Sequence, residues 1–400
     1  MSRLRLGLAV APALVVSATV LLLAAEIASP RVADPPSQAA DLTVHEWGTF
    51  TSVAGEDGSA IEWNALGCKD DLPGFVNEFA YSGLKGRLRG TVRMETPVLY
   101  FYSPRELEAQ VTVAFPQGLL TEWYPRADYA VYQATGKNGP PRRLQPNLNG
   151  LDFSMRGVTG TIEWNHIKVQ PNTTPRLPRE NAPSRYYAAR ETEAAPIAVG
   201  DQHEKFLFYR GVGRFPVPLD VRLSPEGAIL VENRTHDAVP SVILFEHRGD
   251  RLGYRQAGTV EGSTRLERPS LDGTLAQLRY DLEDALVEQG LFLKEAQAMV
   301  ETWRDSWFEE GARLIYVMPS RLMDTILPLR VEPMPSSTAR VFVGRIELVT
   351  PETVRSVTTA LAAGDSATVD RYRRFLEPIV ARMGAGHADR ASQAELLQCR

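Results

Sequence analysis

The stretch VHEWGTFTSV at residues 44–53 is typical of a β-strand, because it is rich in β-branched and aromatic residues. In a strand, His45 and Trp47 point to one face and Glu46 to the other. Trp47 begins an apolar run, so we expect its face to be turned inward. His45 is then expected to be partly buried and to need a hydrogen-bond partner.

Similar runs continue to about residue 265, separated by turn-forming residues. They include VRMETPVLYFYS (92–103), AQVTVAF (109–115), TGTIEWNHIKV (159–169), KFLFYRGV (205–212) and SVILFEHRG (241–249). Because no long helical period separates them, they predict an antiparallel, sandwich-like architecture for the N-terminal two-thirds of the chain. Arg93 and Glu95 alternate onto one face of their run and are expected to form a salt bridge.

After residue 270 the apolar period changes to that of helices. Asp272 is expected to cap a helix that ends at Gly290, and its apolar face comprises Leu275, Leu278, Leu282 and Leu286. A second helix, ending at Gly311, has a stripe of Leu293, Ala296, Val300, Trp303 and Trp307. Together the two helices predict an αα-hairpin.

The remaining chain predicts a few strands and then helices. The strand patterns are RLIYVMP (313–319), LPLRVEP (327–333) and ARVFVGRIELV (339–349). Thr350 and Pro351 are expected to begin a helix that ends at Gly364, and Pro378 is expected to kink a long final helix. The predicted fold class is therefore α+β, β-rich first and helical later.

The N-terminus predicts export. Arg3 and Arg5 precede the uncharged residues 6–25, which are long enough to span a bilayer. Residues 1–25 therefore form either a cleaved signal peptide or a retained membrane anchor, and 26–40 form a Pro-containing linker. The exported part is expected to be periplasmic or extracellular. We divide it into a first β-rich module (41–190), a second (191–268) and an α+β module (269–400).

Composition excludes several classes of protein. The chain has 400 residues, a net charge of −5 and two cysteines. A disulfide-dense scaffold and a cysteine-based metal site are excluded, and nothing in the charge balance predicts nucleic-acid binding. The chain has neither a P-loop nor a G-x-G-x-x-G motif, so nucleotide chemistry has no support and the cofactor stays unknown. Cys68 and Cys399 form the one internal disulfide that is available, or they remain free thiols.

Candidate site residues come from two patterns. Glu-Trp occurs four times, and a carboxylate beside an aromatic ring suits a glycan. The tryptophans are Trp47, Trp63, Trp123 and Trp164, and the carboxylates considered for acid–base work are Glu46, Glu122 and Glu163. A metal site would have to be assembled from separate strands, and its candidates are His45, His166 and His203. Strand alternation argues against adjacent residues sharing either kind of site.

Two functions remain open. The first is a non-catalytic exported protein that binds a glycan or a peptide, or has a structural role. The second is a hydrolase that uses a carboxylate pair or a His/Glu metal site. Clustering of the three glutamates in one cleft would favour the hydrolase, whereas dispersed and packed tryptophans would favour a structural role.

Three segments resemble those of an uncharacterised family of exported bacterial proteins. They are VHEWGTFTSV (44–53), RMETPVLYFYS (93–103) and GRIELVTPE (344–352). The resemblance covers most of residues 44–352. It implies export and a shared fold, and it implies no activity, cofactor or catalytic residue.

Export can be tested with a reporter that is active only outside the cytoplasm. We expect a fusion after residue 60 to be active, because Arg3, Arg5 and the apolar residues 6–25 direct the following chain across the membrane. Deleting residues 6–25 should silence it. A silent full-length fusion whose protein is found in the cytosol would contradict the prediction.

Overall fold

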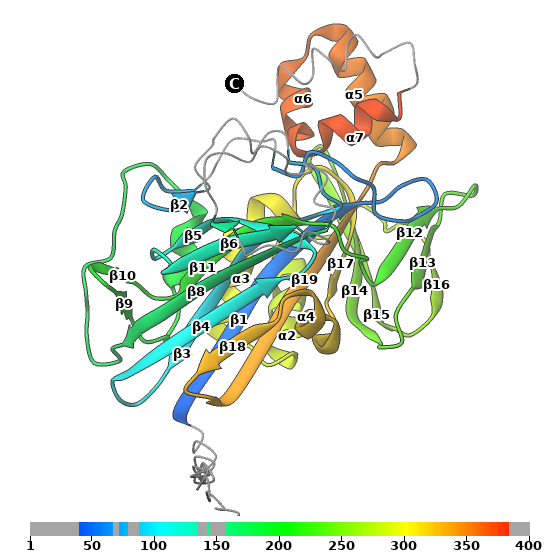
Figure 1. Ribbon diagram of the computed structural model, residues 1–400. Helices are drawn as coiled ribbons and strands as arrows, with labels where there is room; N and C mark the ends of the chain where they lie inside the picture. Colours follow the sequence, from blue (N-terminus) through cyan, green and yellow to red (C-terminus); the bar gives the residue numbers. More distant parts are fainter. Residues whose placement is uncertain (1–39, 67–71, 79–87, 135–141, 144–156, 384–400) are drawn as a thin grey trace, which may run out of the picture. The chain divides into compact units, whose positions relative to one another are not determined.

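The computed structural model describes residues 40–66, 72–78, 88–134, 142–143 and 157–383. The chain divides into two compact units, Met1–Ser37 and Gln38–Arg400, and all described residues belong to the second. They form a β-rich α+β fold (Figure 1), as predicted. No helix in these ranges is both long and apolar enough to cross a membrane. Residues 1–39, Cys68 and Cys399 lie outside the described residues, so the leader and the disulfide stay predictions.

Most strands belong to one large mixed sheet. Its main path runs through β10 (Gln202–Glu204), β9 (Ile197–Val199), β8 (Val158–Val169), β5 (Gly118–Tyr124), β11 (Leu207–Gly213), β3 (Val92–Tyr102), β1 (Ala40–Val53), β19 (Pro335–Leu348), β17 (Gly311–Val317), β14 (Val239–Arg248) and β15 (Arg251–Val260). Beside this path lie β4 (Leu107–Phe115), β18 (Leu329–Glu332), β6 (Tyr129–Ala134), β7 (Arg142–Arg143) and β2 (Asn77–Glu78). A separate three-stranded sheet comprises β12 (Leu219–Leu223), β13 (Ile229–Asn233) and β16 (Ser263–Leu266).

The first and last strands pair at the centre of the large sheet. β1 and β19 are parallel, from Ala40 opposite Pro335 to Val53 opposite Glu347. The sequence predicted antiparallel pairing, which holds for β1 and β3. A parallel neighbour needs a long connection, and here that connection is nearly the whole chain. Strands of the three predicted modules interleave, since β11 lies between β5 and β3, and β19 lies beside β1.

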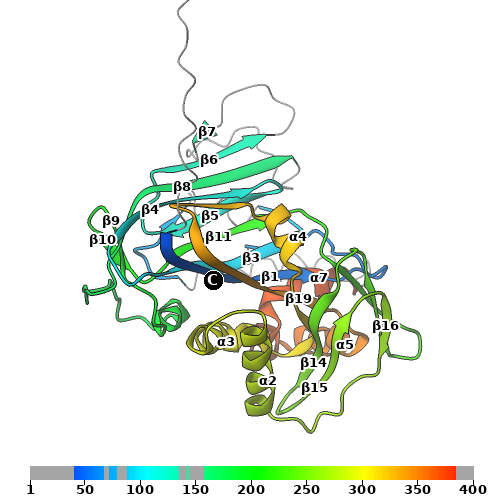
Figure 2. The same ribbon diagram turned by 90° about the horizontal axis from the view of Figure 1, so that it is seen from below.

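The sheet has a different cover on each face. On one face, β4 and β8 form a second layer (Figure 2), and the three-stranded sheet shares the same apolar core. Phe50, Phe115 and Trp164 are buried between these layers. This arrangement bears out the sandwich-like prediction. Gly344 is required here, because a Cβ atom would lie 2.1 Å from the ring of Tyr316.

The opposite face is covered by the predicted αα-hairpin, α2 (Leu275–Glu288) and α3 (Leu293–Trp307), and by the 3-10 helix η1 (Arg185–Arg190). The buried residues of the two helices include Leu278, Leu282, Leu286, Ala296, Val300, Trp303 and Trp307. Two boundaries differ from the prediction. Thr274 rather than Asp272 caps α2, because its hydroxyl accepts from the N–H of Gln277. Gly311 begins β17 instead of ending α3.

After α4 (Ser320–Ile326) and β19, the chain ends in short helices. α5 (Pro351–Ala363) begins after the capping Thr350 and ends at Gly364, whose φ is 69°. The expected long final helix is wrong, because it is broken into α6 (Ser366–Arg371), η2 (Arg373–Phe375) and α7 (Leu376–Ala381). Pro378 lies in the first turn of α7, where an N–H would have no helical partner, so it causes no kink.

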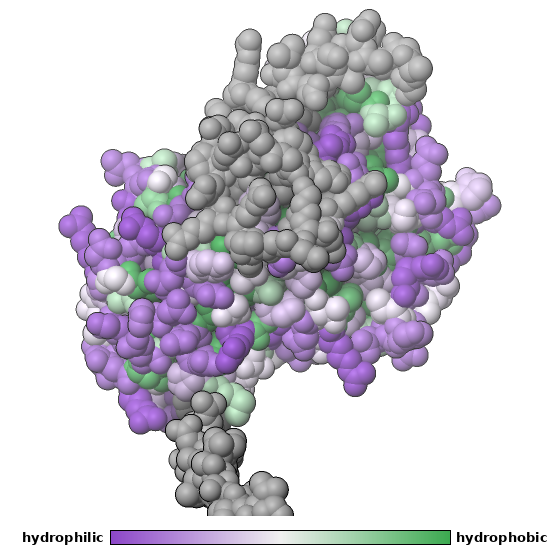
Figure 3. All heavy atoms as spheres, in the orientation of Figure 1, coloured by the Kyte–Doolittle hydropathy of each residue, from purple (hydrophilic) through white to green (hydrophobic). Residues whose placement is uncertain are grey.

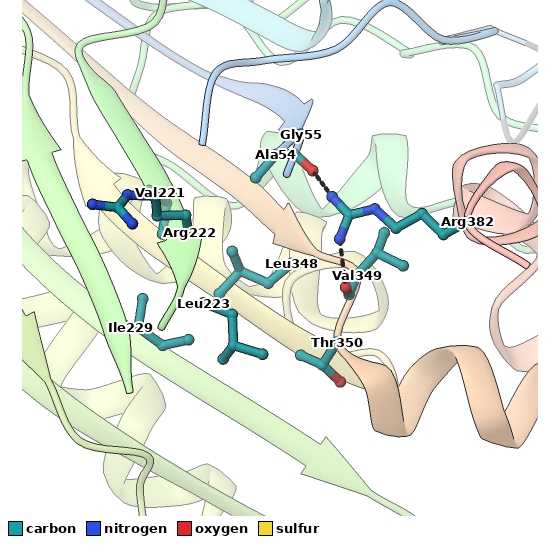
Figure 4. A pocket seen from close by; sticks show the side chains of 10 residues that line it. All are labelled: Ala54, Gly55, Val221, Arg222, Leu223, Ile229, Leu348, Val349, Thr350 and Arg382. Carbon is teal, nitrogen blue, oxygen red and sulfur yellow. Dashed lines mark hydrogen bonds between the residues drawn. The ribbon is translucent and has the colours of Figure 1, made fainter. Parts of the chain in front are cut away.

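Arg382 joins these helices to the sheet. It follows α7 and donates hydrogen bonds to the carbonyl oxygen of Ala54 at 2.7 Å and of Val349 at 2.9 Å (Figure 4). These carbonyls lie just beyond the ends of β1 and β19. The cavity beside them, about 20 Å³ in volume, has room for little more than water.

The hairpin makes a direct prediction about stability. Trp303 is 4% exposed and Trp307 is fully buried, so Trp303→Ala should lower the free energy of unfolding by about 3–5 kcal/mol. Tyr280→Ala is the matched control, because Tyr280 is 64% exposed on the same hairpin. Urea denaturation checks both variants. Equal midpoints for Trp303→Ala and the wild type would contradict the assigned packing.

Candidate functional site

The predicted tryptophan platforms are mostly internal. Trp47, Trp63 and Trp164 are at most 2% exposed. The indole N–H of Trp164 donates to the carbonyl oxygen of Pro125 at 3.0 Å. Only Trp123 is partly exposed, and it packs against the sandwich core. Three of the four rings therefore act as core residues and present no face for a sugar to stack on.

The three predicted glutamates lie in separate places. Glu46 is buried inside the sandwich, where it accepts from the Arg340 guanidinium at 2.6 Å and from the Tyr209 hydroxyl. Glu122 faces the other side of the sheet, beside Arg210. Glu163 is half-buried on the outer face of β8, since its neighbours in the strand point into the core. The structure thus forms no carboxylate pair from these residues.

The three predicted histidines are also separate. His45 Nδ1 lies 2.7 Å from a carboxylate oxygen of Glu295, and His166 Nδ1 lies 2.6 Å from Glu108 at the surface. His203 is on the short edge strand β10. Within the described ranges, no group of three His, Cys, Asp or Glu side chains could hold a metal ion.

His45 instead helps to fix the start of α3. Glu295 is completely buried and accepts from His45, from the Tyr102 hydroxyl at 3.0 Å and from the N–H of Phe292 at 2.8 Å. A carboxylate oxygen can only accept, so His45 Nδ1 carries a proton. The ring also contacts Phe292, with centroids 4.5 Å apart. The expectation that His45 is buried and hydrogen-bonded is therefore confirmed.

The most unusual feature is a group of charged side chains buried on the helix-covered face of the sheet. From the strands come Arg93, Glu95, Glu122, Arg210, Arg313, Arg345 and Glu347. Glu309, after α3, and Arg374, in η2, contact them from the opposite side. We call these nine residues the buried charge network. It lies between the apolar cluster under α2 and α3 and the one under α5 and α7.

Strand register brings the network together. Arg313 and Glu347 are opposite each other on β17 and β19, and Arg313 Nε lies 3.0 Å from Glu347. Arg210 and Glu122 are opposite each other on β11 and β5. Glu95 is 2.8 Å from Arg93 Nε, which confirms the predicted pair. Each charge thus has a neighbour of opposite sign, as buried charges require.

Two arginines extend the network beyond the sheet. Arg345 donates to Ser306 Oγ at 2.8 Å, to Glu347 at 3.2 Å and to Glu309. Arg374 donates to Glu95 at 2.7 Å. These contacts attach α3 and the C-terminal helices to one patch of sheet, so the network has a clear structural role.

Burial and pairing act in opposite directions on Glu309. Burial alone would raise the pKa of this carboxyl group. The positive charges of Arg345, Arg374 and Arg313 outweigh that effect and hold the pKa below the usual 4.5. For Arg345, burial lowers the pKa of the guanidinium, although Glu309 and Glu347 oppose this.

Part of the buried charge network can be found from the sequence alone. Arg345 and Glu347 alternate within the apolar run at 339–349, as Arg93 and Glu95 do in theirs. Charged residues at alternate positions of one strand lie on the same face of the sheet, where they can pair with each other. The partners from β5, β11 and η2 could not be identified, because strand order is not encoded in any single segment.

A second candidate is a surface groove of about 290 Å³ on the three-stranded sheet. Arg222, Leu230 and Arg265 lie side by side across β12, β13 and β16. Asp220, Glu232 and Ser263 form the next row, and Asp57 also lines the groove. Alternation turns Val221 and Val231 inward to the core, so the charged rows face solvent. Hydrophilic residues gather on this part of the surface (Figure 3).

The carboxylates of Asp220, Glu232 and Asp57 lie near one another on one side of this groove. Burial raises the pKa of Asp220 most. Arg234 lowers it, and the negative charges of Glu232 and Asp57 raise it further, so the result is a pKa above the usual value. Arg234, 3.4 Å from Asp220 and 2.6 Å from Glu232, supplies a positive charge on that side of the groove.

No protein-family model matches the chain, and no curated protein matches it. Among the solved structures that match, three mu-homology domains show a distant likeness. The Danio rerio Fcho1 Mu homology domain with bound Eps15 peptide is 9% identical, covering 78% of this chain and 99% of its own, with a TM-score of 0.30. The yeast delta-COP-I mu-homology domain is 9% identical (78% and 97% covered, TM-score 0.27), and its complex with the Dsl1 WxWxV peptide is 10% identical (78% and 97%, TM-score 0.24). TM-scores this low do not establish a shared fold.

The buried charge network predicts a pH effect on stability. Because the folded pKa of Glu309 lies below 4.5, its ionised form stabilises the fold at neutral pH, and this contribution is lost as the pH falls through the folded pKa. Glu309→Gln should therefore lower the urea midpoint at pH 7, and the difference from wild type should shrink in acid.

The control for this effect is Glu106→Gln, at an exposed turn between β3 and β4. It should leave the midpoint nearly unchanged at every pH. A Glu309→Gln difference that is the same at neutral and acid pH would contradict the assigned ion pairs.

Proposed function

We propose that this protein is a non-catalytic binding protein of the cell exterior, that its ligand is a peptide, and that the peptide lies in the groove of the three-stranded sheet. The observation that carries the proposal is the pair of oppositely charged rows in this groove. Arg222 and Arg265 flank Leu230 in one row, and Asp220 and Glu232 lie in the next.

The spacing of the rows suits an extended peptide. The rows are two residues apart along their strands, which is about 7 Å. Side chains on one face of an extended peptide have the same repeat. An acidic and a basic residue separated by one position would therefore face Arg222 and Asp220 at the same time.

The lining favours a peptide over a glycan. Among the described residues that line the groove, none is aromatic, and the buried tryptophans provide no other stacking surface. Binding by charge also needs accessible partners. Arg222 is exposed, and no ion pair ties it to a neighbour within the described chain.

The test uses an array of short acetylated peptides in which Thr alternates with Glu or Lys in every order, together with an array of neutral oligosaccharides. We expect peptides that contain Glu-Thr-Lys or Lys-Thr-Glu to bind, and binding to weaken with added salt because it depends on charge. Arg222→Glu should weaken binding at least about tenfold, the effect of one lost charge pair of about 1.4 kcal/mol.

The matched control is Arg105→Glu, which makes the same change of charge at an exposed turn far along the sequence. It should bind as the wild type does. Binding of oligosaccharides alone, no binding to any peptide, or equal binding by the Arg222→Glu and Arg105→Glu proteins would overturn the proposal.

A further inference from the structure

The buried charge network contains polar atoms that the pairing described above does not use. Thr49 and Thr51 lie beside the network on the same face of β1. The buried atoms that have no hydrogen-bond partner within the described chain include Thr49 Oγ1, Thr51 Oγ1, Glu95 Oε2 and Arg345 Nε. All four residues are completely buried. A buried polar atom without a partner is costly and normally indicates a bound water or ligand.

Strand register sorts these atoms into two pairs. Thr49 on β1 is directly opposite Glu95 on β3. Thr51, two residues further along the same face, is opposite Arg345 on β19. Residues opposite each other in a sheet have their Cβ atoms about 5 Å apart, so the two polar groups of each pair lie close together.

The chemistry of each pair is complementary to water. Glu95 Oε2 can only accept and Arg345 Nε can only donate, while a threonine hydroxyl does both. Water can donate to Glu95 while it bonds Thr49, and it can accept from Arg345 while it donates to Thr51. We infer that two water molecules are bound inside the sheet–helix interface, one between Thr49 and Glu95 and one between Thr51 and Arg345.

The surrounding contacts favour water over a larger or charged ligand. Arg345 already donates its terminal nitrogens to Ser306, Glu309 and Glu347, and its guanidinium lies 4.9 Å from the ring of Phe375. The other oxygen of Glu95 is held by Arg93 and Arg374. A cation at the first position would lie near the Arg93 and Arg374 guanidinium groups. An anion at the second would lie near the Glu309 and Glu347 carboxylates.

The experiment is a crystal structure of the protein at a resolution that shows ordered water. Density within hydrogen-bond distance of both members of each pair is the expected result. The inference would be overturned by a direct hydrogen bond between Thr51 and Arg345. It would also be overturned if no ordered water lay between the two members of either pair.

Isosteric substitution gives an independent readout. If water bonds the hydroxyls, Thr49→Val and Thr51→Val should each raise the unfolding equilibrium constant about 5- to 30-fold. If the hydroxyls have no partner, the same substitutions should leave stability unchanged or increase it, which overturns the inference. Thr302→Val is the reference, because Thr302 is 3% exposed and its hydroxyl donates to the carbonyl oxygen of Ala298 at 2.7 Å. Should a valine variant fail to fold, the density in the wild-type crystal decides.

Discussion

The parallel pairing of β1 with β19 is the contact on which the rest of the structure depends. It sets Thr51 beside Arg345 on the helix-covered face of the sheet and Glu46 beside Arg340 on the sandwich face. Glu46 and Arg340 are 294 residues apart in the chain, yet they form a buried ion pair. Both faces of the sheet therefore receive their central charges from this one register. A shift by one residue would move each charge into an apolar core.

The buried charge network explains how helices from two distant segments remain on one face. Apolar contacts hold α2 and α3 at one end and α5 and α7 at the other. Between them, Arg345 and Arg374 contact both the sheet and the residues after α3. Removing one member of such a pair leaves a charge buried without a partner, which costs about 3–5 kcal/mol. The network therefore holds helices from both segments in a fixed position on the sheet.

Local sequence patterns predicted the elements better than their arrangement. Alternation in residues 44–53 placed His45 and Glu46 on opposite faces, and the apolar stripes placed Trp303 and Trp307 in the core. These follow from the geometry of a single strand or helix. The separation of Glu46, Glu122 and Glu163 depends on which strands are neighbours, and so does the pairing of Arg210 with Glu122. No single segment determines strand order, so site residues chosen by local motif did not meet.

The position of β19 also determines when the fold can be completed. The central strand β1 is made first and its parallel neighbour nearly last, so the sheet stays open while most of the chain is synthesised. Contacts between such distant segments form slowly, since a long loop must close before they are made. Strand order therefore delays completion of the central sheet until β19 has been made.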